Sequence, residues 1–166
     1  MKPLLRIDNL SAGYYNEDII KGVSLDVRTG DFMGIIGPNG SGKTTLLRLC
    51  SKILRPRQGR VYFSAKDIFT MELKEFCRQV AFVSQDISTD FSFSVMEMVL
   101  MGRIPHLKRL QFETKKDTEI CERALTLTGS AELKEKMLNE LSAGERQRAI
   151  IARALAQEPV LLLLDE

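Results

Sequence analysis

Residues 37–44 combine glycines, a lysine and a threonine in a pattern typical of phosphate binding, GxxxxGK[ST]. Glycines leave room for successive backbone N–H groups to surround an anion. Lys43 can then reach the β- and γ-phosphates of a nucleotide, and the Thr44 hydroxyl can bind Mg²⁺. The segment therefore predicts a nucleotide site, and its residues are Gly37, Pro38, Asn39, Gly40, Ser41, Gly42, Lys43 and Thr44.

The elements on either side of this loop are predicted to position it. The apolar run Phe32–Ile36 predicts a buried strand that leads into the loop. Thr44–Leu49 predicts the start of a helix whose N-terminal dipole faces the phosphates. A strand, a loop and a helix in this order form the context in which the pattern holds phosphate, and a glycine-rich turn without a ligand is the alternative.

Two acids follow the apolar run Val160–Leu164, which predicts a strand buried on both faces of a parallel sheet. Ligands of such sheets lie beyond the carboxyl ends of the strands. Asp165 is therefore positioned to bind Mg²⁺ through water, and Glu166 to act as a general base that polarises the attacking water. The alternative is that the two acids merely end a strand, and the phosphate loop argues against it.

A third pattern, Leu141–Glu145, precedes a stretch with apolar residues at helical spacing. Ser142 and Glu145 have the spacing of a capping box, so a well-capped helix is one interpretation. A serine hydroxyl, a glycine and free N–H groups at a helix start also suit a phosphate. The sequence leaves both roles open, and each can hold in a different conformation.

Composition limits the classes of protein that fit. The chain has 166 residues, enough for one domain with an inserted subdomain, and a net charge of +2, which gives no electrostatic argument for nucleic acid. The three cysteines lack the spacing of a metal site, which favours free thiols in a reducing compartment. Since no apolar run can span a bilayer and the start is no secretion signal, we expect any membrane connection to come through a partner.

The remaining pattern divides into strands and a helical block. Residues 94–140 are rich in helix formers, which predicts an all-helical insertion with helices at Thr114–Leu127 and Ala131–Leu138. Four further short strands are predicted, at Leu4–Asp8, Val23–Val27, Arg60–Ser64 and Val80–Ser84.

Taken in order, these motifs resemble the ATP-binding subunit of ABC transporters over essentially the whole chain. Residues 37–44 match the Walker A motif, Leu141–Glu145 the signature usually written LSGGQ, and Val160–Glu166 the Walker B strand. The resemblance implies an α/β fold, with a P-loop NTPase (RecA-like) core, a small antiparallel β subdomain and an inserted α-helical subdomain. The implied boundaries are 1–87 and 149–166 for the core with its β subdomain, and 88–148 for the helical subdomain.

The resemblance also implies roles for individual residues. Lys43, Gln85 and Glu166 would be catalytic, and Thr44, Gln85 and Asp165 would hold Mg²⁺. Tyr14 matches the aromatic residue that stacks on adenine, with Tyr15 as its competitor and a structural tyrosine as the alternative. The implied contacts to ATP are Tyr14, Gly37, Pro38, Asn39, Gly40, Ser41, Gly42, Lys43, Thr44, Thr45, Ser142, Gly144 and Glu145.

The implied partners are a second ATP-binding subunit, arranged head to tail, and integral membrane permease subunits at the cytoplasmic face of the membrane. Each ATP would lie between Walker A of one subunit and Ser142 and Gly144 of the other. A substrate-binding protein would act indirectly, and no nucleic acid is expected. Ser94–Val99 and Gly102–His106 are similar to importers of iron chelates, haem or cobalamin, with His106 as a surface or packing residue.

Two features depart from the family pattern. The signature has Ala143 and Glu145 where glycine and glutamine are commonest, and the Glu145 carboxylate would face a phosphate unless Arg146 or Arg148 neutralises it. The chain also stops at Glu166, which predicts a fragment of a longer ATPase that binds ATP better than it hydrolyses it. A nucleotide-binding module without turnover and a soluble ABC protein outside transport remain the alternatives.

Overall fold

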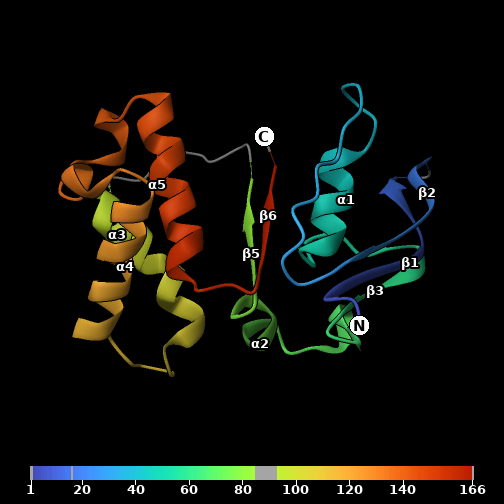
Figure 1. Ribbon diagram of the computed structural model, residues 1–166, viewed down its shortest axis with the longest axis horizontal. Coiled ribbons are helices and arrows are strands. Elements are labelled where there is room, and N and C mark those ends of the chain that lie inside the picture. The colour runs from blue at the N-terminus through green and yellow to red at the C-terminus, as the bar shows by residue number, and fades with distance from the viewer. Residues whose placement is uncertain (1, 16, 85–92, 166) are drawn as a thin grey trace. The chain divides into compact units, whose positions relative to one another are not determined.

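The computed structural model describes residues 2–15, 17–84 and 93–165 (Figure 1). These residues form two compact units, one of residues 2–73 with Asp165 and the other of residues 74–164. The predicted Gln85 and Glu166 lie outside the described residues. Within the part of the chain that the structure describes, no helix has the length and apolar character needed to cross a bilayer.

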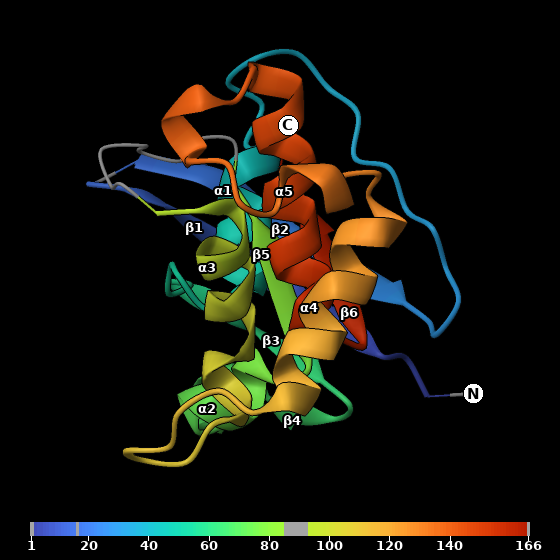
Figure 2. The same cartoon turned by 90° about the vertical axis from the view of Figure 1, so that its left-hand side faces the viewer.

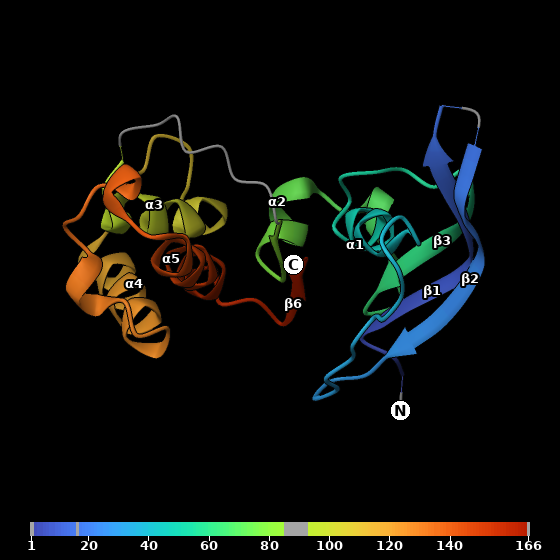
Figure 3. The same cartoon turned by 90° about the horizontal axis from the view of Figure 1, so that it is seen from above.

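The first unit contains a four-stranded antiparallel sheet with the order β2-β1-β3-β4 and the helix α1 (Figure 3). Side chains that alternate along β1 are buried, among them Leu5 and Ile7, and they pack with Val61 and Phe63 of β3. The three strands predicted in this region are confirmed. The elements are β1 (Leu5–Tyr14), β2 (Glu17–Val27), α1 (Lys43–Cys50), β3 (Gln58–Phe63), β4 (Lys66–Asp67) and the 3₁₀ helix η1 (Ile68–Thr70).

The prediction of a buried strand at Phe32–Ile36 is wrong for this structure. The segment has no strand pairing, Phe32 is 100% exposed and Ile36 is 98% exposed. An apolar run becomes a strand only when its backbone groups have a neighbouring strand to pair with. Among the described residues, the strands pair as β2-β1-β3-β4 and as β5 (Val80–Val83) with β6 (Leu161–Leu164), and none of them pairs with this run.

In the second unit, β5 (Val80–Val83) pairs in parallel with β6 (Leu161–Leu164), and three helices pack on one another (Figure 2). Their shared core includes Val95, Cys121 and Ala149, one from each helix. The predicted strands at 80–84 and 160–164 are thus confirmed. The helices are α2 (Leu73–Cys77), α3 (Val95–Leu100), η2 (Met101–His106), α4 (Lys115–Leu127), η3 (Ala131–Leu133), η4 (Leu138–Glu140) and α5 (Ala143–Ala156).

Two expectations for this unit need correction. Two short 3₁₀ turns stand in place of the single helix predicted over Ala131–Leu138, because the backbone between them forms hydrogen bonds with the start of α3. The carbonyls of Lys136 and Lys134 accept hydrogen bonds from the N–H groups of Val95 and Met96, each at 2.9 Å. The strand β6 is also less buried than predicted, since within the described residues only one strand pairs with it.

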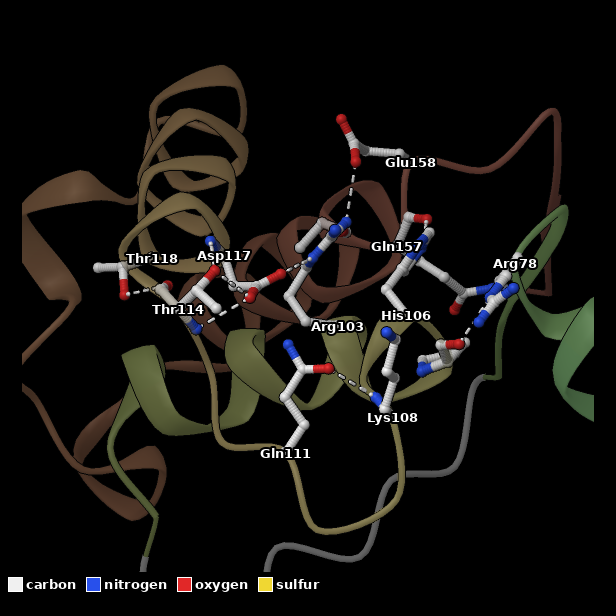
Figure 4. A network of polar contacts seen from close by, with 12 residues as sticks. Arg78, Arg103, His106, Lys108, Gln111, Thr114, Asp117, Thr118, Gln157 and Glu158 are labelled. Carbon is white, nitrogen blue, oxygen red and sulfur yellow. Dashed lines mark hydrogen bonds and ion pairs between the residues drawn. The ribbon is translucent and has the colours of Figure 1, made fainter.

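A buried ion pair connects three of these elements (Figure 4). Arg103 of η2 is 5% exposed, and its Nε lies 2.9 Å from Oδ1 of Asp117 in α4, which is 6% exposed. Nη1 of Arg103 also donates to the carbonyl of Ala156 at 2.7 Å and to Oε2 of Glu158 at 2.9 Å, at the end of α5. Arg103 therefore fastens η2 to the start of α4 and to the end of α5.

Asp117 is held in its ionised form. Hydrogen bonds from Thr114, first from its hydroxyl and then from its backbone N–H, with a smaller contribution from Arg103, lower the pKa of Asp117 from 3.8 to about 2. A carboxylate whose pKa is lower in the folded chain stabilises the fold above its unfolded pKa. That contribution is therefore present above about pH 4 and is lost as the pH falls toward 2.

We expect Asp117→Asn to lower the free energy of unfolding at pH 7 by about 2–3 kcal/mol, because it removes one partner of a buried ion pair. The variant should also lose the part of the pH dependence that lies between about pH 4 and 2. Urea unfolding across this range measures both effects.

The matched control is Glu122→Gln, which breaks the exposed pair between Glu122 and Lys134 at 3.1 Å. Exposed pairs are screened by water, so we expect a loss of about 0.5 kcal/mol or less. Equal losses in the two variants would show that the buried pair contributes no more to stability than the exposed one.

Candidate functional site

The glycine-rich loop turns sharply into α1 at Gly42. This residue is the N-cap of α1 and has a φ of 95°, in the left-handed region that side chains with a β-carbon rarely adopt. A Cβ at Gly42 would also lie 2.8 Å from Cδ1 of Ile20 and 2.9 Å from Cγ2 of Ile19, both on β2. The loop therefore needs glycine at position 42 both for its backbone conformation and for its close approach to the sheet.

Lys43 places a positive charge at this loop. Its Nζ donates hydrogen bonds to the carbonyls of Gly37 at 2.9 Å and Pro38 at 3.0 Å, so the side chain bends back over the loop. The first turn of α1 contains no acidic residue and has no side-chain cap. The helix dipole and the ammonium group thus both favour an anion at the start of α1.

Thr44 and Asp165 meet although 121 positions separate them in the sequence. The Thr44 hydroxyl donates a hydrogen bond of 2.9 Å to Oδ1 of Asp165. Within the described residues there is no group of three or more His, Cys, Asp or Glu side chains that could hold a metal. A hydroxyl and one carboxylate suit Mg²⁺, which takes few protein ligands and keeps water and phosphate oxygens. The residues present fit Mg²⁺ bound together with a nucleotide.

The aromatic candidates lie at the end of β1. Tyr14 is partly exposed, and its hydroxyl accepts a hydrogen bond of 3.1 Å from Nη1 of Arg48 in α1. Tyr15 is almost fully exposed and has a φ of 51°. Stacking of Tyr14 on adenine stays a prediction. Arg48 is a neighbour that the sequence analysis missed, because no motif spacing links it to Tyr14.

Ser142 and Glu145 form the predicted capping box at the start of α5. The backbone N–H of Ser142 donates to Oε2 of Glu145 at 2.8 Å, and Oγ of Ser142 accepts from the N–H of Glu145 at 3.3 Å. The Ser142 hydroxyl also donates to Oε2 of Glu145 at 2.7 Å. Gly144 has open space where a Cβ would stand. The cap interpretation is therefore confirmed in this conformation.

The negative charge of Glu145 is stabilised mainly by Ser142, whereas Arg146 or Arg148 was expected to compensate it. Hydrogen bonds from Ser142, first from its side chain and then from its backbone, lower the pKa of Glu145, and the charges of Lys136 and then Arg148 lower it by smaller amounts. Arg146 instead directs Nη2 to the carbonyls of Leu138 and Leu141, at 3.3 and 3.4 Å. The carboxylate is thus folded back onto its own helix start.

The remaining predicted contacts surround the same loop. Thr45 is buried in α1, whereas Gly37, Pro38, Asn39, Gly40 and Ser41 are exposed. The structure therefore brings together Lys43, Thr44 and Asp165 with the loop and α1, all in the first unit. Ser142, Gly144 and Glu145 belong to the second unit.

The chain is similar in sequence to ATP-binding proteins of transport systems. A family model described as ABC transporter matches residues 20–166. The cobalamin import ATP-binding protein BtuD of Halobacterium salinarum is 42% identical over 148 residues, which are 89% of this chain and 37% of that protein. The ferric enterobactin transport ATP-binding protein FepC of Escherichia coli is 37% identical over 162 residues, 98% of this chain and 60% of that protein.

The fold agrees with the sequence match. An ABC transporter assigned to the metal-chelate type, solved in an inward-facing conformation, has a TM-score of 0.83 and 34% identity, covering 100% of this chain and 60% of that one. The predicted fold class, a P-loop NTPase α/β fold, is therefore confirmed. The chain spans less than two thirds of the length of the relatives described above.

Because Ser142 supplies two of the hydrogen bonds of the cap, we expect Ser142→Ala to lower the free energy of unfolding by about 1 kcal/mol. Glu145→Gln should cost less, since a glutamine oxygen can also accept from the N–H of Ser142. Chemical denaturation of the two variants checks the order. A glutamine variant that is the less stable of the two would contradict the proposed geometry.

Proposed function

The chain belongs to the ABC transporter family, and we propose that it forms the ATP-binding and ATP-hydrolysing part of a subunit that energises an importer. The observation that carries the proposal is the contact of 2.9 Å between Thr44 and Asp165 beside the Lys43 loop. It combines an anion site with two oxygen ligands for Mg²⁺. ATP bound with Mg²⁺ is the ligand that meets both requirements.

Each residue has a task that its position supports. The N–H groups of the glycine-rich loop and the start of α1 would hold the phosphates, while Lys43 would leave the carbonyls of Gly37 and Pro38 for phosphate oxygens. Thr44 and Asp165 would hold Mg²⁺, which neutralises charge on the phosphates when it is bound. In line with the family, we assign the polarisation of the attacking water to Glu166, and to Gln85 a catalytic role and a share in holding Mg²⁺.

We further propose that two such subunits pair head to tail. Ser142 and Gly144 of one copy would then contact the γ-phosphate held by the other, with Glu145 at the edge of that contact. The exposure of Ser142 and Gly144 at the start of α5 supports this arrangement. The γ-phosphate would close the pair, and its loss would release it. Permease subunits at the cytoplasmic face of the membrane would receive the motion.

The substrate class that we favour is an iron chelate, haem or cobalamin. The support is the likeness to relatives named for cobalamin import and ferric enterobactin transport, and to a transporter of the metal-chelate type. The similarity of Ser94–Val99 and Gly102–His106 to such importers points the same way. Contact with a substrate-binding protein would be indirect, through the permease.

ATP binding and phosphate release at saturating Mg²⁺-ATP test the proposal. Lys43→Ala removes the ammonium from the loop, so we expect ATP affinity to fall about tenfold or more and any turnover to vanish. Lys21→Ala, an exposed lysine on β2, is the matched control and should bind ATP like the unchanged chain. Binding without turnover would favour a nucleotide-binding module. An ATP affinity that is unchanged in the Lys43→Ala variant would contradict the proposed ATP site.

The metal ligands are tested by Thr44→Val and Thr44→Ser. Valine removes the hydroxyl while keeping the shape, so the gain in ATP affinity on adding Mg²⁺ should shrink about tenfold. Serine retains the hydroxyl and should keep most of this gain. Titration of ATP with and without Mg²⁺ separates the two variants, and equal behaviour would remove Thr44 from the metal site.

A further inference from the structure

The loop of residues 107–113, between η2 and α4, carries apolar side chains that the fold does not cover. Leu110 is 94% exposed and Phe112 is 86% exposed. The loop projects beyond the helices of its own unit (Figure 2). Two large apolar side chains at one exposed tip cost solvation free energy without adding to the core.

The backbone of this 107–113 loop is held in an unusual shape. The N–H of Gln111 donates to the carbonyl of Lys108 at 3.0 Å, and the N–H of Lys108 donates to Oε1 of Gln111 at 2.9 Å (Figure 4). Inside this turn Leu110 has a φ of 62°, in the left-handed region that favours glycine or asparagine. A leucine in that conformation, facing water, has no explanation in the stability of the turn, which points to a function.

The base of the loop is braced on both sides. Arg103 precedes the loop and Asp117 follows it, so their buried contact of 2.9 Å ties the two ends together. Nζ of Lys74 donates to the carbonyl of Leu107, and Nε of Arg78 donates to that of Pro105 at 2.8 Å. The loop is therefore a fixed projection, which lowers the entropy cost of docking its tip.

Positive charge surrounds the apolar tip. Lys108 and Arg109 lie on the loop and are exposed, and Lys115 and Lys116 are exposed in the first turn of α4. Cations are unfavourable at a helix start, where the dipole is positive, so their presence there does not serve α4. Over 107–116 the acid that accompanies them is Glu113. Apolar side chains flanked by cations match a bilayer that carries anionic headgroups.

We propose that the 107–113 loop docks on an anionic phospholipid surface, with Leu110 and Phe112 inserted at the boundary between headgroups and acyl chains. Lys108 and Arg109, with Lys115 and Lys116, contact the lipid phosphates. A direct contact of this kind would differ from the expectation that any membrane connection comes through a partner, which stays a prediction. It uses none of the residues assigned to ATP, so either proposal can fail without the other.

Co-sedimentation of the chain with vesicles tests the docking. We expect binding to phosphatidylcholine vesicles with about a third phosphatidylglycerol, weaker binding to pure phosphatidylcholine, and release by salt. The double variant Leu110→Ser with Phe112→Ser should lower the partition coefficient about tenfold or more, as should Lys108→Gln with Arg109→Gln.

Matched controls keep the experiment specific. Leu127→Ser changes another exposed leucine, at the end of α4, and Lys21→Gln with Arg123→Gln removes the same charge elsewhere. Both should bind like the unchanged chain. Controls that lose as much binding as the loop variants would overturn the proposal, as would equal binding to neutral and anionic vesicles.

Depth of insertion gives a second measurement. The chain has no tryptophan, so Phe112→Trp introduces a single fluorescent reporter. Its emission should shift to the blue on anionic vesicles and be quenched by lipids with brominated acyl chains, whereas Leu127→Trp should show neither effect. A Trp at position 112 that stays in water while the protein sediments would contradict insertion and favour a purely electrostatic contact.

Discussion

Backbone N–H groups at a helix start have no partner within the helix, and this constraint organises most of the chain. Three helices meet it with reciprocal capping boxes: α3 through Ser94 and Glu97, α4 through Thr114 and Asp117, and α5 through Ser142 and Glu145. The helix α1 begins differently, at Gly42, with no side-chain cap. Its backbone donors are thus not taken by a side-chain cap, and together with the charge of Lys43 they would favour an anion.

The same constraint explains why the buried ion pair between Arg103 and Asp117 stabilises several elements at once. Asp117 is the N3 residue of the α4 cap, and Arg103, which binds it, also donates to the carbonyl of Ala156 at the end of α5. One guanidinium therefore stabilises a helix start and a helix end while it fixes the base of the 107–113 loop. Burial of a charge is costly unless its hydrogen bonds are satisfied. Here the hydrogen bonds that satisfy Arg103 also stabilise the start of α4 and the end of α5.

Local patterns were predictable from the sequence wherever they contain their own partners. The capping box followed from the spacing of Ser142 and Glu145, and the extent of α4 followed from its helix-forming residues, because in both cases the interacting groups lie close together in the sequence. Two predictions were wrong because the structure of the segment depends on backbone that is distant in the sequence. Among the described residues, no strand pairs with Phe32–Ile36. The backbone of Ala131–Leu138 accepts hydrogen bonds from N–H groups at the start of α3. The contact of Thr44 with Asp165 was implied by two motifs together, and its geometry required the fold.

The start of α5 illustrates a competition that the motif alone does not reveal. The Ser142 hydroxyl already donates to the Glu145 carboxylate, so it can donate to a phosphate only after that hydrogen bond opens. Opening it exposes a carboxylate whose pKa the bond lowers, next to an incoming negative charge. The charges of Lys136 and Arg148 also lower that pKa, and they can take over part of the compensation. A glutamine at position 145 would cap the helix without a negative charge. With Glu145 in its place, the opening of the cap would depend more strongly on the charge of the group that approaches Ser142.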